Sequence, residues 1–192
     1  QYSKELSSPV TAFESCSRLS PYFSFGSISI REVFQAIQNK ITQLDEDKVE
    51  GRTVWKRSLR ACMNRLKWHC HFIQKLEMQP EIEFKNLHPL TETIIRSDNK
   101  EYFEKWKAGE TGFTIADASM RALKSTGWIN FRMRAMLVSV ATHHLNLPWQ
   151  NVAGFLSQCF TDYEPGIHYS QCQMQAGTTG INAIRIYNPI KQ

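Results

Sequence analysis

Two arginines interrupt a segment that is otherwise almost wholly apolar. Arg132 and Arg134 lie in a predicted helix over 130–146 whose apolar side chains cover nearly every face, and such a helix is typically buried. Because a guanidinium rarely loses its water unless a carboxylate or a phosphate replaces it, we expect an anion to meet these side chains. Asp162 and Glu164 follow the next helix and are the candidates within the chain if the two helices pack antiparallel. A structural ion pair and a bound anion or cofactor both stay open.

A second place for an anion is the segment 15–26, which reads SCSRLSPYFSFG. Hydroxyls, a guanidinium and free backbone N–H groups in one loop can cradle a phosphate. The same residues also suit a plain loop that leads into a helix through turns at Pro21 and Gly26. The segment by itself does not decide between these two interpretations.

The histidines and cysteines lack the spacing that a metal site needs. His69 and His71 would project in different directions from a helix, and so would His143 and His144. The cysteines are odd in number and form no CxxC pair, which argues against a disulfide framework or a zinc ribbon and favours a reducing, intracellular (cytoplasmic) setting. They are Cys16, Cys62, Cys70, Cys159 and Cys172. We therefore expect no metal, and the motifs of serine hydrolases, P-loop proteins, dinucleotide-binding folds and zinc proteases are missing.

The elements that must position these residues are predicted to be helices throughout. Apolar residues recur with helical spacing and strand alternation is absent, so the fold class is all-α. A helix over 29–48 begins with a capping box of Ser29 and Glu32, and one over 53–77 is long enough to be central. Residues 81–97 read as an irregular crossing segment, which a short aromatic helix near residue 103 follows.

The second half of the chain is predicted as four more helices. Thr114 and Asp117 would form a capping box at the start of a helix over 115–126, and Gly127 would end it in the left-handed conformation. The remaining helices are the buried one over 130–146 and those that begin near Pro148 and Pro165.

Composition indicates one soluble domain. The chain has 192 residues, too few for two full cores, and 42% hydrophobic with 21% charged residues is typical of a globule. No uninterrupted apolar run reaches the ~18 residues of a membrane span. Lys and Arg outnumber Asp and Glu by 23 to 18, and the net charge of +5 suits a phosphate-bearing partner. The first residue, Gln1, indicates a processed chain or an excised domain.

Several segments, in order, carry a resemblance to a known family. They are SRLSPYFSFG, RLKWHCHF, KAGETGFTIADASMRAL, TGWINFRMRAM and DYEPGIHYSQCQMQAG, closing with YNP. Together they resemble the helical FAD-binding domain of the DNA photolyase and cryptochrome family over nearly the whole chain. The resemblance implies an all-α, multi-helical FAD-binding domain over 1–192. Members normally also have an N-terminal α/β antenna-binding domain and further C-terminal helices, which are missing from this sequence.

The resemblance also implies roles for particular residues. Arg134 and Asp162 would be the ion pair alongside the isoalloxazine ring, with Glu164 near its pyrimidine edge and His168 facing its central ring nitrogen. The FAD phosphates would be held by Ser17, Arg18, Leu19 and Ser20, with Tyr2 as an upstream contact. The remaining residues implied to line the cofactor pocket are Arg65, Trp68, His69, Trp128 and Phe131.

The chain departs from the family's pattern at its electron-transfer tryptophans. Cys172-Gln173-Met174 stands where many photolyases have Trp-x-Trp, and the outermost tryptophan would fall near Arg96. Trp149 alone matches, as the middle member, although an inward core residue is an equal interpretation. Tyr163, Tyr169 or another tryptophan could provide a detour for the electron.

The resemblance predicts a blue-light-dependent flavoprotein domain that transfers an electron to pyrimidine lesions in DNA. Arg65 replaces the pocket glutamate of dimer-repairing relatives, which argues against the standard repair arrangement. The alternatives are a cryptochrome-like blue-light sensor without repair activity and a basic helical nucleic-acid-binding module that has lost the flavin.

Overall fold

A computed structural model describes residues 2–181 and 183–190, and every regular element in them is a helix, as the apolar spacing predicted. The first elements are α1 (Tyr2–Glu5), α2 (Ala12–Ser15), α3 (Ser20–Ser24), α4 (Ile30–Glu46), α5 (Arg52–Met78), and the 3-10 turns η1 (Pro80–Glu83) and η2 (Pro89–Thr93). Those that follow are α6 (Lys100–Ala108), α7 (Thr114–Thr126), α8 (Phe131–Ser139), a π-helical turn η3 (Val140–His144), α9 (Trp149–Cys159) and α10 (Pro165–Ala176).

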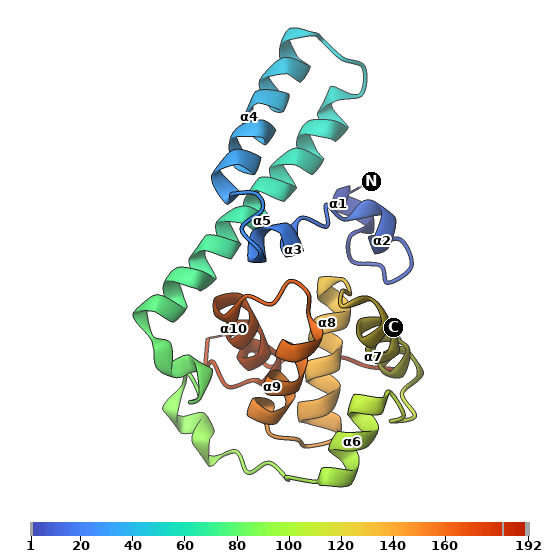
Figure 1. The fold of residues 1–192 in the computed structure, drawn as a ribbon, viewed down its shortest axis with the longest axis vertical. Coiled ribbons are helices and arrows are strands. Elements are labelled where there is room, and N and C mark those ends of the chain that lie inside the picture. The colour runs from blue at the N-terminus through green and yellow to red at the C-terminus, as the bar shows by residue number, and fades with distance from the viewer. Residues whose placement is uncertain (1, 182, 191–192) are drawn as a thin grey trace.

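Helices α6 to α10 form a helical body, which lies below the N-terminal helices in Figure 1. Its core is a single apolar cluster to which every one of these helices contributes. Helix α8 crosses the middle of the body, and Met136 and Leu137 on it are fully buried. The buried helix predicted over 130–146 is therefore confirmed, although it changes to π-helical geometry after Ser139.

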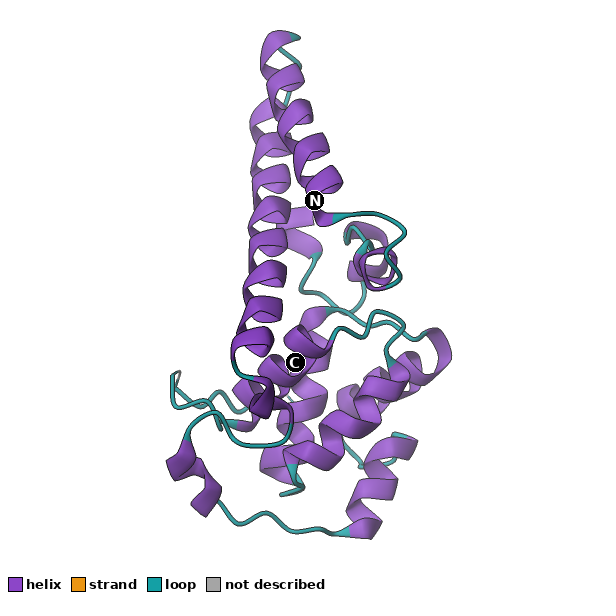
Figure 2. Cartoon of the chain, turned by 60° about the vertical axis from the view of Figure 1, so that its left-hand side comes forward, coloured by secondary structure: helices purple, strands orange, loops and turns teal. Residues whose placement is uncertain are grey.

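Helices α4 and α5 form a long antiparallel hairpin that projects away from the body (Figures 1 and 2). Ser29 caps α4 through the predicted box: its hydroxyl accepts from the Glu32 amide at 3.1 Å, and Glu32 returns a bond to the Ser29 amide at 2.8 Å. A small cluster around Val33, Ile37 and Leu66 joins the two helices. The expectation that α5 is central holds only for its second half, because its first turns belong to the projecting hairpin.

The ends of α7 differ from the prediction. The capping box of Thr114 and Asp117 is wrong, since Thr114 lies inside the helix and makes no such bond. Asp117 instead accepts from the backbone amides of Thr111 and Gly112, both at 2.9 Å, and so ties down the loop before the helix. The C-terminal end is as predicted, with Gly127 left-handed at φ 69°.

Helix α10 crosses α5 at very short range, and small residues make this possible. A Cβ on Gly166 would stand 2.8 Å from the Cα atom of Ile73 and from the carbonyl oxygen of Phe72. Ser170 lies one turn further along α10 and is also buried, with no hydrogen-bond partner for its hydroxyl. This contact fixes where the loop before α10 stands relative to α5.

Gly166→Ala should therefore destabilise the protein. The added methyl group would meet backbone atoms that cannot rotate away, so we expect the free energy of unfolding to fall by about 1–3 kcal/mol, the usual cost of overpacking. Gly154→Ala on α9 is the matched control, because its Cβ would meet nothing within 4 Å. This substitution should raise the free energy of unfolding by ~0.4–1 kcal/mol, because alanine restricts the unfolded chain more than glycine does. Urea unfolding measures both, and a Gly166→Ala midpoint equal to that of the wild type would contradict the contact.

Candidate functional site

An ion pair joins α8 to the loop before α10. The two terminal nitrogens of Arg134 donate to the two carboxylate oxygens of Asp162 at 2.9 and 2.8 Å, and its Nε donates to the Ile129 carbonyl at 2.9 Å. The guanidinium also lies 4.2 Å from the centre of the Phe160 ring. The Asp162 side chain is 3% exposed and that of Arg134 is 25% exposed. The pair is thus buried on one side and open on the other.

The neighbouring arginine does not share this environment. Arg132 is exposed at the start of α8, so the expectation that an anion must meet it is wrong. Phe131 is 46% exposed as well. The first turn of α8 reaches the surface because its polar and aromatic side chains face away from the core that Met133 enters.

Glu164 begins α10 as its N-cap residue. Its two carboxylate oxygens accept from the backbone amides of Gly166 at 3.2 Å and Ile167 at 2.9 Å. A carboxylate at this position also interacts favourably with the helix dipole. The charge of Glu164 reaches His69 on α5, where it raises the pKa of the imidazole against the stronger lowering caused by burial. Glu164 therefore caps α10 within electrostatic reach of α5.

His168 is a buried, neutral histidine in the second turn of α10. Burial lowers its pKa to about 4, with further lowering by Arg134, while its contact with the Ala153 carbonyl and the charge of Asp162 act in the opposite direction. Its Nε2 lies 2.9 Å from the Ala153 carbonyl oxygen. A carbonyl can only accept, so Nε2 carries the proton and Nδ1 is left as an acceptor.

Three predicted site residues lie on the second half of α5. The Arg65 guanidinium stands 5.8 Å from the centre of the Phe131 ring, which brings α5 and α8 together. Trp68 is 56% exposed and stacks on Phe72 with ring centres 5.8 Å apart. His69 has a buried Nδ1 without a hydrogen-bond partner.

The predicted phosphate loop lies between the N-terminal helices and the body. Arg18 has a left-handed backbone with φ 52°, and its guanidinium stands 4.8 Å from the Trp128 ring and 5.3 Å from the Phe13 ring. Ser17 is exposed and Ser20 begins α3. The Leu19 side chain packs into the hairpin cluster instead. The structure brings Arg18 to Trp128 but sends Leu19 elsewhere.

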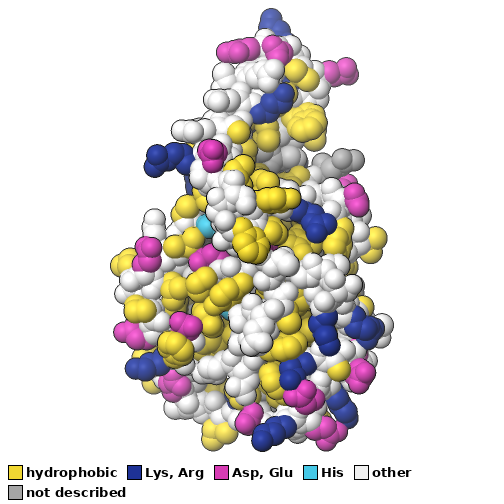
Figure 3. Space-filling view, in the orientation of Figure 1, with side chains coloured by type: hydrophobic (Ala, Val, Ile, Leu, Met, Phe, Trp, Pro, Cys, Tyr) yellow, Lys and Arg dark blue, Asp and Glu magenta, His cyan; other side chains and the backbone are white. Residues whose placement is uncertain are grey.

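Tyr2 and Cys16 lie where these elements meet. Burial, followed by nearby Cys62, raises the pKa of Tyr2 to about 12, and Arg65 opposes the shift. Burial also raises the pKa of the Cys16 thiol, while Arg18, Arg65 and Arg134 oppose it. Three arginines from three different elements therefore act on one thiol. Figure 3 shows apolar side chains gathered around this junction of the hairpin, the N-terminal helices and the body.

The family described as the FAD binding domain of DNA photolyase matches residues 62–192, which is more than half of the chain. The chain belongs to this family. FAD is accordingly its cofactor, and the all-α fold is that of the photolyase FAD-binding domain.

Named relatives and solved structures agree with this assignment. A deoxyribodipyrimidine photo-lyase of Alkalihalophilus pseudofirmus is 29% identical over 92% of this chain and 35% of its own length. A class III photolyase structure from Agrobacterium tumefaciens has a TM-score of 0.84 at 25% identity, over 98% of this chain and 37% of that one. An archaeal photolyase from Sulfolobus tokodaii, solved with two FAD molecules, has a TM-score of 0.71 at 30% identity, over 90% and 36%. The chain spans little more than a third of the length of these proteins.

The residues at the junction fit an anionic, polar cofactor such as FAD. Among the described residues Arg134 has a carboxylate partner, whereas Arg18 and Arg65 form no ion pair and rest on aromatic rings. Two unpaired guanidinium groups suit a pyrophosphate or a polar ring edge. The buried Nδ1 of His69 also lacks a partner that a cofactor could supply. The predicted contacts of this photolyase domain with FAD stay predictions.

The electron-transfer residue predicted by resemblance has a clear structural role. Trp149 is 2% exposed in the body's core, and its Nε1 donates to Asn86 Oδ1 at 2.7 Å. Cys172 is buried beside His168, with Sγ 3.9 Å from Nε2. Arg96 donates to the Ala176 carbonyl at 3.0 Å and so closes the end of α10. These side chains join elements of the photolyase domain to one another.

Two contacts of the site were not found from the sequence. Phe160 belongs to the core cluster of the body, and its ring also faces Arg134. Phe13 was not predicted to belong to the site. Its ring contacts the Arg18 guanidinium, as the Trp128 ring does, and it meets Trp128 edge-on with ring centres 5.2 Å apart. An aromatic ring beside an arginine leaves no spacing signal when the two residues lie on different elements.

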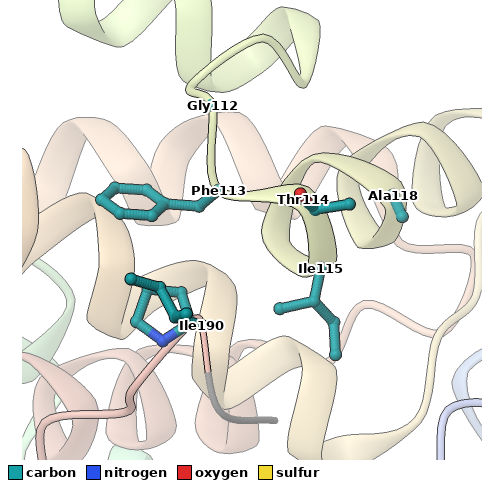
Figure 4. Close-up of a pocket in the computed structure, with 7 residues that line it drawn as sticks. Gly112, Phe113, Thr114, Ile115, Ala118 and Ile190 are labelled. Carbon is teal, nitrogen blue, oxygen red and sulfur yellow. The ribbon is translucent and has the colours of Figure 1, made fainter.

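A cavity of about 600 Å³ lies elsewhere in the photolyase domain, between the start of α7 and the C-terminal residues. Phe113 and Ile115 line it from one side and Ile190 from the other (Figure 4). None of the predicted FAD-binding residues borders it.

Two further findings concern the described part of this photolyase domain. It contains no helix that is both long and apolar enough to cross a membrane. It also contains no group of three or more His, Cys, Asp or Glu residues placed to hold a metal ion.

Breaking the ion pair at one end should cost more than losing an exposed pair. Asp162→Asn would leave Arg134 without its charge partner on the buried side, and we expect about 3 kcal/mol of destabilisation, the lower end for buried pairs because Arg134 is partly exposed. Glu101→Gln, which breaks an exposed pair with Lys105 on α6, should have little effect. Thermal and urea unfolding test this, and equal losses in both variants would show that the pair is solvated.

The neutral His168 should make the fold sensitive to acid. Its pKa is about 4 in the folded chain against 6.5 ordinarily. Between these two pH values the imidazole is protonated in the unfolded chain and neutral in the folded chain. Stability is therefore lost as the pH falls from 6.5 to 4, by up to about 3 kcal/mol. His168→Gln should lose less over this window, as measured by urea midpoints at several pH values. An identical loss in both proteins would mean that His69 and His143, whose pKa values burial also lowers, carry the effect.

Proposed function

We propose that this chain is the cofactor domain of a light-dependent DNA repair flavoprotein, in which FAD passes an electron to a pyrimidine lesion. The observation that supports this most is that Arg18, Arg65 and Arg134 all contact one short segment, through Trp128, Phe131 and Ile129 respectively. The relatives named as deoxyribodipyrimidine photo-lyases support the reaction class. FAD, when bound, supplies the light absorption and the electron transfer.

The residues at the junction would bind and orient the cofactor. Arg18 with Ser17 and Ser20 would hold the phosphates, and the Arg134 and Asp162 pair would present one donor edge and one acceptor edge to the ring system. Tyr2 keeps its phenolic proton at neutral pH because its pKa is about 12, so it can donate a hydrogen bond there. His168 would present the acceptor Nδ1, because Nε2 is committed to Ala153.

DNA would approach the exposed ring of Trp68. A lesion must leave the base stack before an enzyme can act on it, and a flipped base is usually held against apolar or aromatic side chains. Trp68, stacked on Phe72, offers such a surface beside Arg65. The net charge of +5 would favour the approach of the DNA backbone.

A blue-light sensor without repair activity is the second candidate. What supports it is Arg65, which the family resemblance places where dimer-repairing relatives have a glutamate. A guanidinium cannot accept the hydrogen bonds that a carboxylate would accept from a lesion. The two functions differ in whether illuminated protein restores damaged DNA.

FAD binding is the first measurement, made by fluorescence quenching on refolded or flavin-stripped chain. Arg18→Ala should weaken binding by roughly tenfold to a hundredfold, through the loss of a charge-assisted contact worth ~1.5–3 kcal/mol. Arg31→Ala, which removes an exposed arginine from α4, should leave the affinity within about twofold of the wild type. A folded chain that binds no FAD would instead support a nucleic-acid-binding module that has lost the flavin.

Repair is then assayed with a thymine oligonucleotide that carries pyrimidine dimers, under blue light and in darkness. Loss of dimers in the light alone, by FAD-loaded protein, is the expected result. Flavin photoreduction without dimer loss would favour the sensor.

A further inference from the structure

Two tyrosines form a hydrogen-bonded pair beside the candidate site. The Tyr163 hydroxyl donates to the Tyr169 hydroxyl at 3.4 Å. Both rings meet His168 edge-on, with ring centres 5.3 and 5.2 Å away respectively. The three rings therefore form one contiguous group, contributed by the loop before α10 and by α10 itself.

This group borders the Arg134 and Asp162 pair. His168 lies within electrostatic reach of both residues, and its ring centre is 6.2 Å from that of Phe160. Phe160 in turn lies under the Arg134 guanidinium at 4.2 Å. Aromatic contacts thus run from the tyrosines to the ion pair without a break.

A carboxylate also lies within electrostatic reach of Tyr169. The Gln173 amide, one turn after Tyr169 on α10, donates to the carbonyls of Ile82 and Lys85 at 2.7 and 2.8 Å. These carbonyls flank Glu83, so the bonds hold that residue against α10. The charge of Glu83 reaches the Tyr169 hydroxyl and, after burial and Tyr163, contributes to raising its pKa.

The positions of the family's electron-transfer tryptophans do not form such a chain of aromatic contacts in this protein. The family resemblance places Cys172 where many photolyases have a tryptophan, and Trp149 makes no aromatic ring contact among the described residues. A thiol whose pKa burial raises to about 12 stays protonated at neutral pH and is a poor electron donor.

We propose that Tyr169, supported by Tyr163 and Glu83, is the electron and proton donor that reduces the illuminated cofactor in this domain. This inference rests on the proposed function. With FAD bound and illuminated, one electron would leave the Tyr169 ring for the oxidised flavin, and the O–H bond would break as its proton passes to the Glu83 carboxylate, which releases it to solvent before the next cycle. A neutral tyrosyl radical remains. A thiol reductant in solution returns one electron and one proton, and two such cycles convert two thiols into one disulfide and deliver two electrons to the flavin.

The first test is the rate of anaerobic flavin photoreduction under blue light with dithiothreitol, on FAD-loaded chain. Tyr169→Phe should slow it by at least about tenfold. Tyr102→Phe, which alters an exposed tyrosine on α6, should leave it within about twofold of the wild type. Solvent deuterium should slow the wild type and leave the residual rate of Tyr169→Phe unchanged. A wild-type rate in Tyr169→Phe, or loss of photoreduction in Trp149→Phe alone, would overturn the proposal.

The second test needs no flavin and separates this proposal from FAD binding. Tyrosine labelled with carbon-13 at the hydroxyl-bearing ring carbon reports the hydrogen bonding of each phenol by NMR. Glu83→Gln should shift the Tyr169 signal, which Tyr169→Phe assigns, and leave the Tyr102 signal in place. An unmoved Tyr169 signal would show that Glu83 is not its partner and would overturn the proposal. A moved signal in a chain that binds no FAD would leave the contact between Tyr169 and Glu83 standing but would refute the proposed function, and the electron donation with it.

Discussion

The position of α10 against α5 decides the geometry of everything at the junction. Gly166 lets the two backbones approach so closely that no side chain fits between them. Glu164, two residues earlier, caps α10 and faces His69 as a consequence. Asp162 reaches Arg134 from the same loop. A helix packed one methyl group further away would shift all of these carboxylates relative to α5, because they share one short and well-bonded segment.

Positive charge at the junction is handled in two ways. Arg134 is partly buried and has a carboxylate with both oxygens engaged, as an internal guanidinium requires. Arg18 and Arg65 are exposed and rest on aromatic faces. Cation–π attraction stabilises a guanidinium there without a negative charge that would neutralise it. A carboxylate beside each of these arginines would also have stabilised it but would have cancelled its positive electrostatic potential. The aromatic arrangement therefore preserves a positive site in a partly apolar setting.

The helices could be predicted from sequence because local signals and burial agree along most of the chain. The Ser29 capping box, the glycine at 127 and the prolines at 148 and 165 all mark the helix ends observed. The Asp117 signal failed because a carboxylate can cap backward into a loop as readily as forward into a helix. Charge in an apolar helix predicted an anion beside Arg134 but left an internal ion pair and a bound anion open, and the family resemblance implied the Asp162 pair that the structure shows. Arg132 was misjudged because a helix buried in its middle can still expose its first turn.

Helix α5 serves three neighbours with three faces, and this links the hairpin to the site. Leu66 faces α4, Arg65 faces α8, and Ile73 meets α10. The hairpin core is small, with three buried residues against the large cluster of the body, so its local stability should be the lower of the two. A ligand bound between α5 and α8 contacts both parts and stabilises whichever arrangement it binds. The ligand should therefore stabilise mainly the hairpin, since the body is already closely packed without a ligand.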